Sequence, residues 1–517
     1  MTTGRDTQSE WQPLLDELEQ RRAAAYDAGG EARTRREHDL GRFTARERID
    51  MLCDPGSFLE FGTFTTTPTP DRILPSSMIC GLAEIDGRPV AVGAEDYTVE
   101  AGAVGIHLRK IKGSFGGFIE ELAYGYRIPL VLLLQGVGGN VYLQELKGYA
   151  ELVSSLGTAP MFDLLDRVPV VTAVLGPAAG SSAARAGISH FSIMSEPHGC
   201  CFAAGPPLVK TALGLEVDKF QLGGVDVHTR RSGLINNPAI DEPDAFAQIR
   251  RFLSFLPSEA TSLPPTVESW TTADPNDLFS VVSPNGRRAY DVHALISGVF
   301  DTDSFFEMTP NFGPSLRTGL ARLEGMPVGV LATDNRHLAG SMNAPAARKQ
   351  ADFVRMCDRF GLPLVYLVDA PGFLVGPEAE AEGVLTFGAD ALRAIHEVTV
   401  PVYTVQVRRS FGLGGQATGN PGPTSLRLSW PSGIWGDMPV QGGIEAAFKA
   451  ELENSADKAA LRAELEERFR KQTSTWTTVE RFGVDEMIDP RDTRKYLGRL
   501  LRLARHSRAA ELRDTRH

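Results

Sequence analysis

The sequence predicts an α/β protein made of two homologous halves, because its main strand pattern occurs twice. Residues 128–140 read IPLVLLLQGVGGN and residues 362–376 read LPLVYLVDAPGFLVG, and both are apolar runs that end in a glycine turn. A second pair follows, VPVVTAVLGPAAGSS from Val168 and VPVYTVQVRRSFGLGG from Val400. A strand and turn that recur in this way indicate an internal repeat.

The spacing within the two halves supports the same conclusion. The prolines that open the paired strands are 40 positions apart in one half (Pro129 and Pro169) and 38 apart in the other (Pro363 and Pro401). Segments with helical periodicity separate these strands. Each half is therefore predicted to consist mostly of βαβ units with a parallel sheet.

The elements before the first repeated strand follow from periodicity and end signals. Residues 11–25 have helical periodicity, and TARE (Thr44 to Glu47) fits a capping box at the start of a second helix. Strands are expected at SSMICGLAEID (76–86) and at RPVAVGAED (88–96).

A break between the halves is expected at Pro257 to Asp277, which is rich in Pro, Ser, Thr and Asp and has no core pattern. We expect halves of 1–265 and 266–517. Near the end, residues 453–472 form a charged, exposed helix and residues 495–508 an amphipathic one with a basic face. That face could lie on a membrane surface, or it could belong to a solvated terminal helix or a subunit contact.

Composition excludes several classes of function. The net charge of −12 over 517 residues argues against nucleic acid or an anionic membrane as the main partner. The five cysteines have no metal-ligand spacing, so no metal site is expected, and free thiols suit a reducing cytoplasm. The start of the chain has no apolar segment typical of an export signal, and no apolar run approaches the length of a membrane span. We expect a cytoplasmic protein.

No nucleotide-binding, zinc-protease or nucleophile-elbow motif is present, so the candidate chemistry is that of backbone N–H groups. Two converging N–H groups can stabilise a developing oxyanion by several kcal/mol. The glycines could instead serve only to permit tight turns, but turns at corresponding places in two repeats favour two oxyanion sites. The candidate residues are Gly138 and Gly139, Gly180 and Ser181, Gly372 and Phe373, and Leu413 and Gly414.

Longer motifs carry a resemblance to a known family. AEDYTVEAGA (94–103), LGGVDVHTRRSG (222–233) and VDAPGFLVGPEAEAEG (368–383) are similar to the carboxyltransferase (β) subunits of biotin-dependent acyl-CoA carboxylases, a branch of the crotonase superfamily. The last motif and SFGLGG (410–415) look most like the methylcrotonyl- and geranyl-CoA carboxylase branch. The likeness implies two crotonase-like (ClpP/crotonase) ββα-superhelix half-domains.

The resemblance also implies that the two halves bind different substrates. The first half would bind acyl-CoA, with the thioester oxygen at Gly138–Gly139 and Gly180–Ser181 as an enolate forms. The second half would bind carboxybiotin, with the ureido oxygen at Gly372–Phe373 and Leu413–Gly414. The basic residues Arg109, Lys110 and Lys112 are expected near the CoA phosphates. Alternatively, they form only a solvated helix face.

Partners follow from the same resemblance. The chain has no biotin-attachment sequence and no ATP-binding half, so the biotin carrier and biotin carboxylase would be on another polypeptide. In this family the first half of one subunit faces the second half of another, which implies a homo-oligomer, commonly a hexamer.

The sequence departs from the family pattern in three places. The family's SGGAR turn is VGGNV (137–141), its AGGA turn is AGSS (179–182), and its WPxAxxxVMGG stretch is WPSGIWGDMPVQGG (430–443). Trp435, in the last of these, could occupy the place of the biotin ring. A biotin-independent acyl-CoA decarboxylase, or a related enolate enzyme on the same scaffold, and a catalytically silent scaffold subunit therefore stay open as alternatives.

Overall fold

The computed structural model describes residues 4–27, 29–68, 73–103, 117–139, 145, 159–286, 288–438, 440–472 and 475–514. The chain divides into two compact units, Met1–Leu253 and Ser254–His517. This division comes earlier in the chain than the boundary expected at residue 265.

The segment expected to separate the halves is held by arginine side chains of the second unit. Arg322 donates a hydrogen bond to the carbonyl oxygen of Pro265 at 3.0 Å, and Arg505 donates to that of Pro264 at 2.7 Å. Because these bonds use backbone carbonyls, any residue type could accept them. The composition of the segment therefore gives no sign of its place in the second unit.

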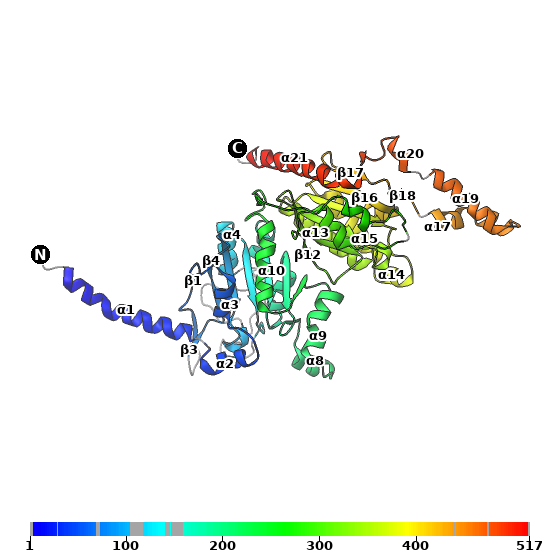
Figure 1. The fold of residues 1–517 in the computed structure, drawn as a ribbon. Coiled ribbons are helices and arrows are strands. Elements are labelled where there is room, and N and C mark those ends of the chain that lie inside the picture. Colours follow the sequence, from blue (N-terminus) through cyan, green and yellow to red (C-terminus); the bar gives the residue numbers. More distant parts are fainter. Residues whose placement is uncertain are drawn as a thin grey trace. The chain divides into compact units, whose positions relative to one another are not determined.

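The first unit has a mixed sheet at its centre, coloured blue to green in Figure 1. Its strand order is β1-β4-β5-β6-β7-β9-β11. Its strands are β1 (Leu59–Phe61), β4 (Met78–Ile85), β5 (Arg88–Glu95), β6 (Leu130–Leu134), β7 (Val170–Val174), β9 (Phe191–Ser195) and β11 (Asn237–Ala239). Smaller ladders pair β2 (Thr66–Pro68) with β3 (Ile73–Pro75) and β8 (Pro177–Ala179) with β10 (Cys200–Phe202). The helices are α1 (Gly4–Tyr26), α2 (Glu31–Asp39), α3 (Ala45–Leu52), α4 (Phe118–Tyr126), α6 (Ala159–Leu165), α7 (Ser181–Gly187), α8 (Pro206–Leu213), α9 (Lys219–Gly223) and α10 (Glu242–Phe255).

The second unit has the same plan, with strand order β12-β13-β14-β15-β16-β17-β19 and β18 paired to β16. Its strands are β12 (Phe306–Met308), β13 (Leu316–Leu323), β14 (Met326–Thr333), β15 (Leu364–Ala370), β16 (Val402–Phe411), β17 (Leu426–Ser429), β18 (Ile434–Gly436) and β19 (Glu486–Met487). Its helices are α11 (Asp277–Val281), α12 (Val292–Val299), α13 (Ala344–Arg359), α14 (Pro377–Ala381), α15 (Val384–Glu397), α16 (Gly412–Gln416), α17 (Val440–Ala447), α18 (Lys449–Asn454), α19 (Lys458–Gln472), α20 (Thr475–Val479) and α21 (Thr493–Asp514).

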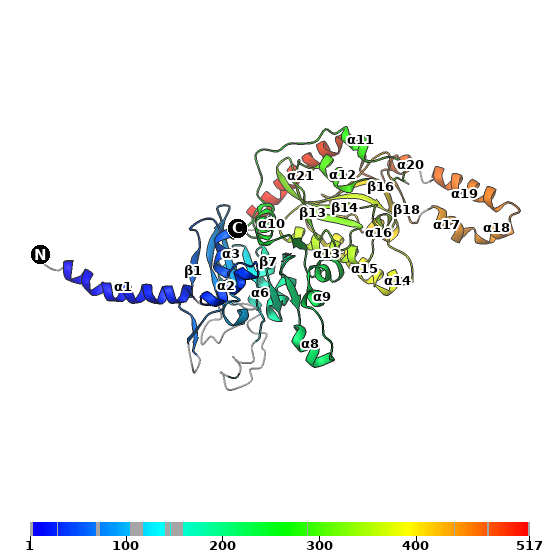
Figure 2. The same cartoon turned by 60° about the horizontal axis from the view of Figure 1, so that its bottom comes forward.

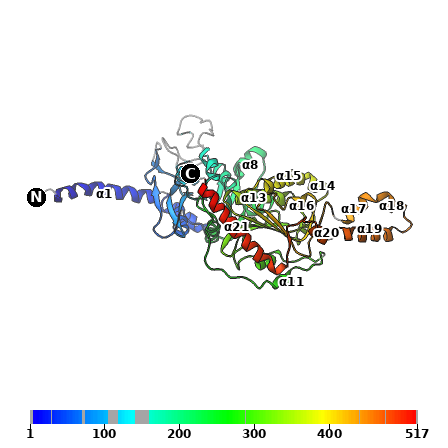
Figure 3. The same cartoon turned by 90° about the horizontal axis from the view of Figure 1, so that it is seen from above.

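Helices cover both faces of the second unit's sheet. Figure 2 shows α12 and α21 on one side of the sheet and α13 and α15 on the other. Consistent with this cover, all residues of β15 are buried, as are all residues of β6 in the first unit. The helices α17, α18 and α19 extend away from the rest of the second unit (Figure 3).

The internal repeat is visible in the backbone hydrogen bonds. In each unit the carbonyls of the two prolines that open the repeated strands accept equivalent ladder bonds of 2.8 or 2.9 Å. The bonds run from Ala91 N to Pro129 O, Leu130 N to Pro169 O, Gly329 N to Pro363 O and Leu364 N to Pro401 O. β5, β6 and β7 are parallel in the first unit, as are β14, β15 and β16 in the second. The predicted α/β class with parallel sheets is confirmed.

The hairpins before the parallel strands also repeat. The turn at Asp86–Gly87 has φ values of 52° and 72°, and the turn at Glu324–Gly325 has φ values of 53° and 74°. Two residues with positive φ are typical of a type I′ turn. In each unit one carboxylate accepts both N–H groups of the turn, from Asp54 in the first unit and from Asp301 in the second.

The terminal helix α21 packs against its own unit. Leu497, Leu501 and Ala504 on its apolar face are buried in the core of the second unit, and its charged side chains are mostly on the other face. A helix whose apolar face is already buried has no such face to place in a membrane. No helix among the described residues has the length and apolar character needed to cross a membrane.

Candidate active site

The two candidate turns of the first unit lie close together. Gly138, just beyond β6, has φ +72°, and a Cβ built on it would lie 2.7 Å from the carbonyl oxygen of Ala179 and 3.6 Å from the backbone N of Ser181. The space and the backbone angle both require glycine there. A Cβ built on Gly139, the next residue, would have no atom of the described residues within 4 Å.

The N–H groups of the second of these turns differ in their availability. Gly180 has φ +60° and donates its N–H to the carbonyl of Phe202 at 3.2 Å. Ser181 is the first residue of α7, and the first N–H groups of a helix have no acceptor within the helix. Of this pair, Ser181 is therefore the candidate donor to a ligand.

An open pocket of about 610 Å³ borders the first of these turns. Gly139 and Val137 form part of its wall, and Arg33, Arg36 and Glu37 of α2 form another part. These arginines were not among the predicted site residues, although the run RTRRE (33–37) gives a charge signal for them. The predicted basic residues Arg109, Lys110 and Lys112 lie outside the described residues, so their proposed role stays a prediction.

The α2 wall of this pocket is fixed by a buried polar network. Glu37 accepts hydrogen bonds from Arg42 Nε at 2.8 Å and from Gln135 Nε2 at 2.9 Å. Burial alone would raise the pKa of Glu37, but these two bonds and the charge of Arg42 outweigh it and lower that pKa. Gln135 directly follows β6, so the network connects α2 to the start of the first turn.

The two candidate turns of the second unit also lie close together. A Cβ built on Gly414 would be 2.8 Å from the carbonyl carbon of Gly372 and 3.1 Å from the backbone N of Phe373. Gly372 has φ +123°. The carbonyl of Gly372 and the N–H of Leu374 both bond to Met342, so the N–H of Phe373, between them, points to the opposite side.

The second unit repeats the helix start seen in the first. Gly412, with φ +58°, precedes Leu413 at the beginning of α16, just as Gly180 precedes Ser181 at the beginning of α7. Leu413 is therefore the positional equivalent of Ser181. Leu413 is 49% exposed.

A buried charged cluster holds the strands beneath the second-unit turns. Asp369 of β15 accepts hydrogen bonds from Arg408 Nη2 at 2.6 Å and Arg409 Nε at 2.7 Å, both from β16. Burial alone would raise the pKa of Asp369, but the two arginines and Asn335 outweigh it and lower that pKa. The ends of the two strands that carry the turns are thus fixed to each other.

A second open pocket, of about 420 Å³, lies beside Gly412 and Leu413. Trp435 of β18 lines it, and the indole Nε1 donates to Thr478 Oγ1 at 3.1 Å, which fixes the ring at the wall. Trp430, by contrast, is buried in the core and donates to Thr493 Oγ1 at 2.9 Å. The altered 430–443 stretch thus supplies one core residue and one wall residue, and the pocket between Trp435 and Leu413 stays open.

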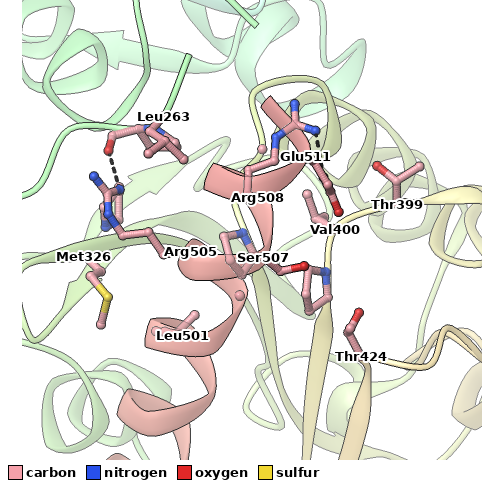
Figure 4. A pocket seen from close by; sticks show the side chains of 16 residues that line it. Leu263, Met326, Thr399, Val400, Thr424, Leu501, Arg505, Ser507, Arg508 and Glu511 are labelled. Atoms are coloured by element: carbon pink, nitrogen blue, oxygen red, sulfur yellow. Dashed lines mark hydrogen bonds and ion pairs between the residues drawn. The ribbon is translucent and has the colours of Figure 1, made fainter. Parts of the chain in front are cut away.

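A third pocket lies at the other end of the second unit's sheet, where Pro363 and Pro401 open β15 and β16. It has a volume of only about 70 Å³ and is partly closed by α21, whose Arg508 pairs with Glu511 at 3.2 Å (Figure 4). Active sites of parallel sheets lie at the carboxyl ends of the strands. The size and position of this pocket argue against a part in the chemistry.

Two histidines, His228 and His337, have hydrogen-bond partners within the protein. His228 bonds to the carbonyl of Cys201 at 2.8 Å and to Ser232 Oγ at 2.9 Å, and His337 bonds to Asp334 at 3.0 Å. Within the described ranges no cluster of three or more His, Cys, Asp or Glu side chains could hold a metal ion.

One buried group gives the second unit a pH-dependent stability. Lys349 of α13 donates to the carbonyl of Thr309 at 3.1 Å, and burial lowers the pKa of its ammonium group from 10.5 to about 7. Between those pH values the unfolded chain keeps a proton that the folded chain has lost, so the free energy of unfolding rises with pH.

We expect Lys349→Met to remove this dependence. Relative to the wild type, the variant should gain most stability near pH 7 and below, and this gain should shrink toward pH 10.5. Urea unfolding at two pH values between 7 and 10.5 measures the difference in the free energy of unfolding between variant and wild type. Lys495→Met, at an exposed lysine, is the control. A difference that is the same at both pH values would show that Lys349 keeps its proton throughout.

Comparison with known proteins agrees with the geometry. Residues 36–517 match the family described as the carboxyl transferase domain. The chain is 34% identical over 511 residues to the propionyl-CoA carboxylase carboxyltransferase subunit of Haloferax mediterranei, covering 96% of this chain and 97% of that protein. It is 31% identical over 536 residues to the biotin-dependent acetyl-/propionyl-CoA carboxylase beta5 subunit of Mycobacterium tuberculosis, covering 97% of this chain and 94% of that protein.

A solved structure extends the likeness to the whole fold. The crystal structure of transcarboxylase 12S, described as a hexamer with methylmalonyl-CoA and methylmalonic acid bound, superposes with a TM-score of 0.85 at 29% identity, covering 95% of this chain and 94% of that chain. The expected likeness to the methylcrotonyl and geranyl branch stays a prediction. Because the family match runs from residue 36 to the end, the chain belongs to the carboxyl transferase domain family, together with the carboxyltransferase subunits of acyl-CoA carboxylases.

Proposed function

We propose that this chain transfers a carboxyl group from carboxybiotin to an acyl-CoA, as the carboxyltransferase subunit of an acyl-CoA carboxylase. The observation that supports it most is the repeated pairing of turns, Gly138 with Ser181 and Phe373 with Gly414. Each pair brings backbone groups together at the carboxyl ends of parallel strands. Two such places provide for two oxyanions, and therefore for two substrates.

In the first unit we assign the acyl-CoA. The N–H groups of Gly139 and Ser181 would hold the thioester oxygen and stabilise the enolate when the acyl group loses a proton. Arg33 and Arg36, in the wall of the same pocket, are candidates for the CoA phosphates, because guanidinium groups bind phosphate in a bidentate manner. The acidic net charge of the chain makes such a local cationic patch necessary.

In the second unit the residues fit a biotin ring. The pocket at Leu413 has an aromatic wall, Trp435, and the turn with Phe373 and Gly414 offers backbone donors for a ureido oxygen. Carboxybiotin would supply the carboxyl group there and, after CO₂ leaves, a ureido nitrogen that can accept the proton of the acyl group. A biotin-independent decarboxylase would not need this second site.

The assembly is part of the proposal. By likeness to its relatives, we expect a homo-oligomer such as a hexamer, in which the acyl-CoA unit of one subunit meets the biotin unit of another. The biotin carrier and biotin carboxylase would be separate partners. The five cysteines are free and buried, which suits the cytoplasm.

The direct test is reconstitution. The purified chain is mixed with a biotin carboxylase, a biotinylated carrier, ATP, labelled bicarbonate and a panel of acyl-CoA esters from acetyl to geranyl. We expect label in at least one acyl-CoA, dependent on both this chain and the carrier. If no ester is labelled while the Haloferax mediterranei subunit works with the same carrier, the proposal is wrong.

A further inference from the structure

Glu95 lies directly behind the first-unit turns. It is the last residue of β5, and only 7% of it is exposed. Its Oε2 accepts a hydrogen bond from the backbone N of Gln135 at 2.8 Å and another from Ser182 Oγ at 2.6 Å. Gln135 begins the turn after β6, and Ser182 is in the first turn of α7. One carboxylate oxygen is therefore bonded to both segments that carry the candidate oxyanion donors.

The carboxylate also packs against the turn itself. A Cβ built on Gly136 would lie 2.9 Å from Glu95 Oε2 and 2.8 Å from the carbonyl oxygen of Gly102. On its other side, Glu95 Oε1 is 3.7 Å from Arg185 Nη1, and Arg185 also pairs with buried Glu120. The space around the Glu95 carboxylate is thus filled. The distance between the turn after β6 and the first turn of α7 therefore depends on this carboxylate.

Burial and the polar partners of Glu95 act on its charge in opposite directions. Burial raises the pKa of Glu95, whereas Arg185, the Ser182 hydroxyl and the N–H of Gln135 act against that rise. Hydrogen bonds to an ionised acceptor are about twice as strong as neutral ones. Burial of an ionised carboxylate without such partners would lower the stability of the folded protein.

The second unit uses a different arrangement at the same place. Thr333 of β14 has the register position of Glu95, and its hydroxyl accepts from Asp369 N at 3.3 Å. The carboxylate there belongs to Asp369 itself and binds arginines of β16. Ser182, moreover, stands where the family's AGGA turn ends in alanine, and its bond to Glu95 gives that departure a physical reason.

We propose that Glu95 is a positioning residue for the acyl-CoA oxyanion site, and that Ser182 is its partner. The inference rests on the proposed carboxyl transfer. Through Gln135 and Ser182, Glu95 sets the separation of the two turns and so the direction of the N–H groups of Gly139 and Ser181. Misplacement of such groups by about 1 Å can cost about 100-fold in rate.

The test compares variants of the full chain in the reconstituted carboxylase. Ser182→Ala should lower kcat by about 5-fold, and Glu95→Ala should lower it by about 10- to 100-fold. In both variants the KM for acyl-CoA should stay within about 3-fold of wild type. Glu95→Gln should recover most of the kcat, because an amide oxygen can accept both bonds. Glu120→Gln is the control, since it removes a buried carboxylate from Arg185 without touching either turn, and it should leave kcat unchanged.

The two substitutions should also couple. In a double-mutant cycle, Ser182→Ala should have little further effect on kcat once Glu95 is alanine, because the partner is already gone. An unchanged kcat in folded Ser182→Ala, or equal losses in Glu95→Ala and Glu120→Gln, would overturn the positioning role while the wild type stays active. A wild type without any carboxyl transfer would instead overturn the proposed function and this role with it.

Discussion

Replacing Gly139 by proline is expected to lower kcat for carboxylation by about 10²- to 10³-fold, which is the usual cost of losing one oxyanion donor. Proline removes the backbone N–H of the residue that faces the open side of the first turn. The preceding residue, Gly138, is a glycine and tolerates the restriction that proline imposes on its neighbour. The measurement is steady-state kinetics on protein whose folding has been checked by circular dichroism.

The matched control is Gly139→Ala. Among the described residues no atom lies within 4 Å of a Cβ at this position, and the φ of Gly139 is not among the positive values, so alanine fits while its N–H is kept. Its kcat should stay within about 3-fold of wild type. If the proline variant is as active as the alanine variant, the thioester oxygen is held elsewhere.

Gly414→Ala should lower overall carboxylation by at least about 10²-fold, although the side chain gains only a methyl group. That methyl would lie 2.8 Å from the carbonyl carbon of Gly372 and 3.1 Å from the N of Phe373. Both neighbours are backbone atoms, so the two second-unit turns must move apart, and their N–H groups can no longer converge.

The effect of Gly414→Ala should be confined to the biotin half-reaction. Binding of acyl-CoA, measured by calorimetry, should be unchanged, because the first unit is not altered. Gly286→Ala is the control in the same unit, since a Cβ there has no atom within 4 Å in the part of the chain that the structure describes. Full carboxylation activity in Gly414→Ala would mean that the second-unit turns hold no oxyanion.

Much of the fold could be predicted because it depends on local patterns. Two apolar runs that begin with proline and end with glycine gave equivalent strands, down to the ladder bonds accepted by Pro129 and Pro363. The Thr44–Glu47 capping box is also present as predicted, with Thr44 N bonded to Glu47 at 2.7 Å. Periodicity and cap signals lie within a few residues of each other, so one sequence is enough to find them.

The parts of the site that could not be predicted depend on contacts between distant segments. Glu95 meets Ser182 only because β5 ends and α7 begins at the same edge of the sheet. Arg408 and Asp369 meet through the register of neighbouring strands, and a sequence pattern does not fix that register. The place of Trp435 at a pocket wall depends in the same way on the pairing of β18 with β16.

The most direct test of the account is the reverse reaction, because it separates a two-substrate enzyme from a decarboxylase. The purified chain is given malonyl- or methylmalonyl-CoA with and without free biotin, and loss of the carboxyl group is followed by the unsubstituted acyl-CoA formed. We predict a loss that depends on biotin and falls at least about 10²-fold in Gly414→Ala. Decarboxylation that proceeds equally without biotin, and is indifferent to Gly414→Ala, would contradict the assignment of the second unit to biotin.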